Sequence, residues 1–103
     1  MEPNSEEVEN VGQALIILNQ FHYTDEQLNV LNMFLQTYGT EYSETGFEKA
    51  FSEPESEDIL NAVKALHAFT QKYQSNKIIA DEIKMEFDDT LFNLNDSSNS
   101  ITF

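Results

Sequence analysis

Apolar side chains recur every three or four positions along most of this chain, which is the spacing of one face of an α-helix. The clearest case begins at Thr24. Gln27 lies three residues after Thr24, as in a capping box, where each side chain accepts a hydrogen bond from the other residue's backbone. Apolar residues then return at helical spacing, and Gly39 follows where a left-handed helix end favours glycine. The segment therefore predicts a helix whose start and end are both specified locally.

Three further segments combine this spacing with a residue able to cap a helix start. They predict helices at about 6–21 capped by Ser5, at about 44–51 capped by Ser43, and at about 53–73 capped by Ser52. In the third segment, Glu55 lies three residues after Ser52 and would complete a capping box. Pro54 is tolerated there because the first turn of a helix leaves its N–H groups unpaired.

The segment 76–94 fits two interpretations. As a helix it places one apolar stripe on a single face: Ile79, Ile83, Phe87, Leu91 and Leu94. As a strand it alternates, with Ile83, Met85 and Phe87 pointing one way. We favour the helix, because no other segment offers a pairing partner and a lone strand is not stable. The sequence thus predicts an all-α fold, a small bundle of four to five helices with short connections, over residues 1–94. Residues 95–103 are expected to form a disordered C-terminal tail.

Charge limits the partners that such a bundle could bind. Nineteen acidic residues stand against five lysines and no arginine, for a formal net charge of −14. This field repels nucleic-acid phosphates and favours a basic protein partner. The longest apolar run, Ala14–Leu18, is far shorter than the roughly 20 residues that a membrane span needs. With an acidic N-terminal stretch and no cysteine, a cytoplasmic protein without a membrane partner is expected. Self-association is left open.

Sequence motifs for chemistry are missing. No calcium loop, no Glu-x-x-His pair, no glycine-rich phosphate loop and no G-x-S-x-G occurs. The two histidines, His22 and His67, lie at helix boundaries or edges. We therefore predict that the protein is not an enzyme and uses no catalytic residue, no cofactor and no metal. The order of helix, glycine turn and helix over 24–51 resembles a helix-turn-helix, but its second helix is too acidic for DNA, so a plain hairpin is favoured.

Two dense groups of carboxylates are the remaining candidates for function. We predict that they form one partner-binding face: Glu41, Glu44, Glu48, Glu53, Glu55, Glu57 and Asp58. A third group follows at 81–89. Carboxylates held on a rigid scaffold can imitate DNA phosphates and occupy the basic groove of a DNA-binding protein. The alternative interpretation is a solvated helical surface with no partner.

The functional hypothesis is an acidic inhibitor of a nucleic-acid-binding protein or nuclease, acting as a DNA mimic. An arginine-free composition suits an AT-rich genome, such as that of a mobile genetic element. The alternative hypothesis is an immunity, antitoxin or secretion-chaperone protein that neutralises one dedicated partner, using acidic residues together with an apolar groove.

Overall fold

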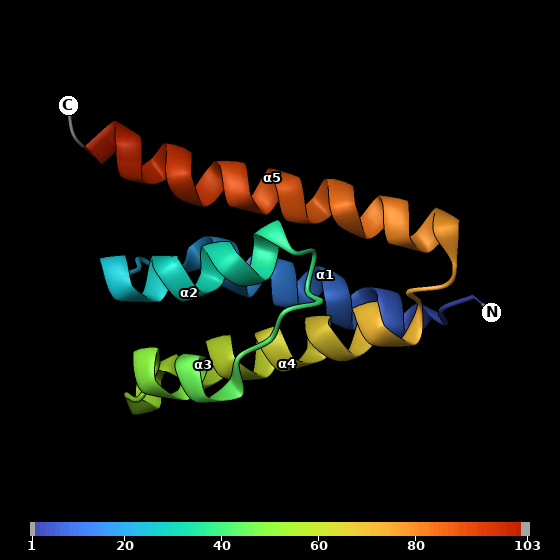
Figure 1. Ribbon diagram of the computed structural model, residues 1–103, viewed down its shortest axis with the longest axis horizontal. Helices are drawn as coiled ribbons and strands as arrows, with labels where there is room; N and C mark the ends of the chain where they lie inside the picture. The colour runs from blue at the N-terminus through green and yellow to red at the C-terminus, as the bar shows by residue number, and fades with distance from the viewer. Residues whose placement is uncertain (1, 102–103) are drawn as a thin grey trace.

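The computed structural model describes the backbone of residues 2–101 and the side chains of residues 2–95. In this part of the chain the fold is all-α, as predicted, and its five α-helices fall within the predicted four to five (Figure 1). One short 3-10 helix, which was not predicted, accompanies them. The elements are α1 Ser5–Gln20, α2 Asp25–Gln36, α3 Glu44–Ala50, η1 Pro54–Ser56, α4 Glu57–Lys72 and α5 Lys77–Ile101. The tail predicted at 95–103 lies mostly outside the described side chains.

The four long helices pack in two pairs. Helix α1 packs against α4, and α2 packs against α5, which runs in the opposite direction (Figure 1). A smaller contact joins α1 to α5 and closes the bundle. The short helix α3 packs against α2 and lies alongside the start of α4 at one end of the bundle (Figure 1).

Phenylalanine rings join the short helix to the rest of the bundle. Phe34 of α2, Phe47 of α3 and Phe87 of α5 are fully buried, and the Phe34 ring centroid lies 5.8 Å from each of the other two. Each buried phenylalanine contributes roughly 1.5–3 kcal/mol relative to an exposed one. A seven-residue helix is unstable alone, so this packing is what holds α3 in place.

The helix starts confirm the predicted caps at Thr24 and Ser43 and correct the predicted cap at Ser5. Thr24 Oγ1 accepts from the Gln27 N–H at 3.2 Å, and Gln27 Oε1 accepts from the Thr24 N–H at 3.0 Å, so the capping box is confirmed. Ser5, predicted as the cap of α1, is instead its first residue. Asn4 caps α1 and forms a capping box with Glu7.

The capping box predicted for Ser52 and Glu55 is wrong. Pro54 begins the 3-10 helix η1, and α4 starts only at Glu57. Neither helix has a side-chain cap. The 3-10 turn separates Ser52 from α4 and places Glu55 inside η1, so Glu55 is not the third residue of an α-helix.

The segment 76–94 is helical, as favoured from its apolar stripe. Ile83, Phe87 and Leu94 are buried, while Ile79 and Leu91 are half-buried against the same core. Helix α5 is assigned to Ile101, which extends it past the predicted end at Leu94.

Gly39 holds the loop between α2 and α3 in place through hydrogen bonds of its backbone. Its φ of +79° is the left-handed conformation predicted from the sequence, and its N–H donates to the Phe34 carbonyl at 2.9 Å. From α4, the His67 Nδ1 lies 2.7 Å from the Gly39 carbonyl oxygen. The loop is thereby tied to α4, which sets the position of the α3 start.

Candidate functional site

All seven predicted partner-binding carboxylates are exposed. Glu41 precedes α3, and Glu44 and Glu48 lie one turn apart on α3. Glu53 occupies the position before η1 without a side-chain capping hydrogen bond. The other three follow directly: Glu55 in η1, then Glu57 and Asp58 in the first turn of α4. We call these seven residues the α3–α4 acidic surface.

The two halves of this surface are anchored by the same buried rings. Phe47 and Phe51 are buried and stack with their centroids 5.9 Å apart, while Ile59 buries the start of α4 in the same core. Helix α3 therefore meets η1 and α4 at one end of the bundle (Figure 1). The third acidic group, at 81–89, lies on α5 with α2 between it and α3, so it belongs to a different face (Figure 1).

No lysine neutralises this surface by direct contact in the described part of the chain. Lys49 is its nearest lysine in the sequence, but the ion pair found among the described residues joins Lys72 to Glu7, at 2.7 Å. The carboxylates also act on Tyr42, whose ring packs against His67 and Phe47. Burial raises the pKa of the Tyr42 hydroxyl, and the charges of Glu44 and Glu48 raise it further.

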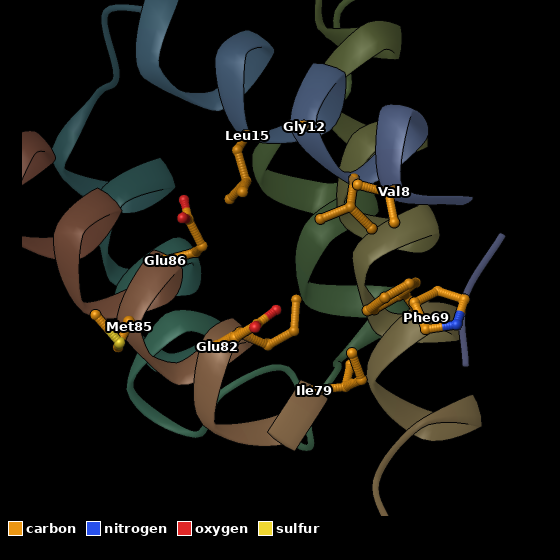
Figure 2. Close-up of a pocket in the computed structure, with 11 residues that line it drawn as sticks. Val8, Gly12, Leu15, Phe69, Ile79, Glu82, Met85 and Glu86 are labelled. Atoms are coloured by element: carbon orange, nitrogen blue, oxygen red, sulfur yellow. The ribbon is translucent and has the colours of Figure 1, made fainter. Parts of the chain in front are cut away.

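A second candidate surface is an apolar groove of about 400 Å³ between α1, α4 and α5 (Figure 2). Val8 and Leu15 of α1 and Ile79 of α5 point into it, and Phe69 of α4 lies between Val8 and Ile79 in this view. Its remaining lining residues are Pro3, Val11, Gly12, Glu82, Ile83, Met85 and Glu86. We call it the α1–α5 groove.

Two carboxylates lie at the edge of the groove on its α5 side. Glu82 and Glu86 are spaced by one helical turn, and both line the groove (Figure 2). Both are exposed, and within the described residues neither makes an ion pair. The groove therefore combines an apolar floor with unneutralised negative charge at its rim.

Sequence reasoning did not find the groove. It placed residues 6–21 in one helix and the carboxylates of 81–89 in a third acidic group, without joining the two. The available local signal was the Glu82–Glu86 spacing beside the apolar positions Ile79 and Ile83. How far α1 and α5 stand apart is decided by packing between segments about 70 residues apart, which no local pattern reports.

Other site types find little support in the described residues. No group of three or more histidine and carboxylate side chains there could hold a metal ion. No described helix is long and apolar enough to cross a membrane. His67 is engaged with the Gly39 carbonyl, and His22 is exposed.

Comparisons with protein-family models, with curated proteins and with solved structures each find no match.

Proposed function

We propose that this protein binds a basic protein in the cytoplasm, and that its α3–α4 acidic surface takes the place of DNA phosphates on a nucleic-acid-binding protein or nuclease. The observation that carries the proposal is that seven carboxylates are exposed within residues 41–58 without an ion pair to any described lysine. Such a surface attracts a basic groove and raises the rate of encounter.

The scaffold beneath the carboxylates supports this proposal. Ser43 Oγ accepts from the Gly46 N–H at 3.1 Å and caps α3, while Phe47 and Phe51 are buried. Charges on a backbone fixed in this way lose less conformational entropy on binding than charges on a flexible segment. A fixed array of this kind is what imitation of a phosphate backbone requires.

The test is capture of partners from host extract at low and high salt, with DNA as the competitor. We expect a basic nucleic-acid-binding protein that is retained at low salt, released at high salt and displaced by DNA. A neutral or acidic partner that is unaffected by DNA would contradict the mimicry.

A second candidate function is favoured by the α1–α5 groove. An immunity, antitoxin or secretion-chaperone protein neutralises one dedicated partner, and an apolar groove with an acidic rim suits that role. In the same capture experiment, this function predicts a partner that resists high salt, because burial of apolar surface does not depend on charge screening.

A further inference from the structure

We infer that the α1–α5 groove is a docking site for one basic amphipathic helix of a partner protein. The helix would place apolar side chains over Phe69 and Ile79 and lysine or arginine side chains beside Glu82 and Glu86. This inference is independent of the proposed DNA mimicry, because the groove and the α3–α4 acidic surface share no residue.

The groove is an open trough rather than an enclosed cavity. Val8 and Met85, on its two sides, are 54% and 67% exposed, so apolar surface remains in contact with water after folding. Burying such surface is the main gain when an amphipathic helix enters a groove. Methionine suits this position because its flexible side chain adapts to the shape of a partner.

Gly12 leaves room for a second backbone on the α1 side. A β-carbon added at Gly12 would meet no atom within 4 Å. The helix surface is thus lowest where Gly12 faces the groove, and a partner helix could approach closely there. Glycine weakens a helix by roughly 1 kcal/mol relative to alanine, so the open space at this position comes with a loss of stability.

Charge selects a basic occupant. Glu82 and Glu86 lie one helical turn apart, which is also the spacing of basic side chains three or four residues apart on a partner helix. Helix α5 carries five carboxylates and two lysines between Lys77 and Asn95. An acidic helix would be repelled by this rim. A second copy of this chain is disfavoured as the occupant, because each copy has a net charge of −14.

The test uses the full chain and a synthetic amphipathic peptide with leucines on one face and lysines beside them. A length of roughly 18 residues allows the peptide to form a helix. The control peptide replaces its lysines with glutamates. Gly12→Leu fills the groove from α1, and Gly12→Ala is its matched control, since neither side chain meets a neighbour at its β-carbon. Circular dichroism checks that both variants are folded.

At physiological salt we expect the wild type and Gly12→Ala to bind the lysine peptide and not the glutamate peptide. Gly12→Leu should weaken binding by at least about tenfold, because it occupies the space that the peptide needs. The double variant Glu82→Gln/Glu86→Gln should weaken it by about three- to tenfold and reduce its salt dependence.

Three results would overturn the inference. One is equal affinity of Gly12→Leu and Gly12→Ala for the lysine peptide. Another is equal binding of both peptides. The third is a dimer of the wild type, seen by light scattering, that Gly12→Leu dissociates, which would make a second copy the occupant. Neutralising Glu53, Glu55, Glu57 and Asp58 should leave peptide affinity within about threefold, because screening acts over about 8 Å, so failure of the mimicry remains a separate result.

Discussion

At the scale of single residues, Gly39 is the position where the backbone most clearly restricts the side chain. Its φ is +79°, and an added β-carbon would lie 3.0 Å from Thr70 Oγ1 and 3.1 Å from the Phe87 ring. We predict that Gly39→Ala lowers the free energy of unfolding by about 1–3 kcal/mol in urea denaturation. Gly12→Ala is the control and should be neutral or stabilising by up to about 1 kcal/mol. Equal effects of the two substitutions would contradict this account.

Glu7 is a carboxylate whose hydrogen bonds stabilise the fold directly. Hydrogen bonds from the side chains of Lys72 and Tyr73 and from the Asn4 N–H lower the pKa of Glu7 from 4.5 to about 2. A carboxyl group whose pKa is lower in the folded state stabilises the fold above its unfolded pKa. That stabilisation is therefore present above pH 4.5 and is lost as the pH falls through about 2.

We predict that Glu7→Gln lowers the melting temperature at pH 7 and that its difference from the wild type shrinks as the pH falls from about 5 toward 2. The comparison of variants at each pH removes the general relief of charge repulsion, which both share. Glu9→Gln serves as the control, because Glu9 is exposed and has no ion pair among the described residues. A difference that stays constant over this pH range would contradict the role of Glu7.

At the scale of elements, helix α5 carries one phenylalanine that faces the core and one that faces solvent. Phe87 is fully buried against Phe34, whereas Phe92 is 68% exposed. We predict that Phe87→Ala lowers the free energy of unfolding by about 3–5 kcal/mol. Phe92→Ala should change it by less than about 0.5 kcal/mol. Urea denaturation checks both, and a large effect of Phe92→Ala would indicate that Phe92 is buried in solution, for example in a dimer.

Helix starts provide a second test at this scale. Thr24 forms a capping box with Gln27, so we predict that Thr24→Ala lowers the free energy of unfolding by about 0.5–2 kcal/mol. Ser52 occupies a similar sequence pattern but caps no helix, so Ser52→Ala should cost less than about 0.5 kcal/mol. Denaturation curves in urea decide between them, and equal losses would restore the predicted Ser52 cap.

These elements show how far local sequence determines the fold. Thr24, Gly39 and the stripe through Ile83 and Phe87 predict their helices because capping and periodicity act within a few residues. The Ser52 prediction is wrong because Pro54 opens a 3-10 turn before α4, and the sequence pattern alone does not distinguish that turn from a helix start.

At the scale of the whole molecule, the acidic composition is read directly from the sequence, but the contacts that arrange the helices are not. Glu7 and Lys72 meet across 65 residues, and the α1–α5 groove joins segments about as far apart. Contacts of this range follow from the packing of helices, which periodicity does not specify. The seven carboxylates of the α3–α4 acidic surface were identified from the sequence, and their exposure on one end of the bundle was added by the structure.

The central claim is that partner binding depends on where the carboxylates lie and not on the total net charge. Two variants separate these two explanations. The first neutralises Glu53, Glu55, Glu57 and Asp58 as Gln or Asn. The second neutralises four exposed carboxylates outside both candidate surfaces: Glu2, Glu9, Asp81 and Asp88. Each removes four negative charges and changes the formal net charge from −14 to −10.

The most direct measurement is the dissociation constant of each variant for the basic protein captured in the partner experiment, obtained by competition with labelled DNA. We predict that the first variant binds at least about tenfold more weakly than the wild type and competes poorly with DNA, because several charge contacts are lost together. The second variant should stay within about threefold of the affinity of the wild type, because salt screens charges that lie outside the binding face. Equal weakening of both variants, or none in either, would contradict the claim that the α3–α4 acidic surface is the binding face.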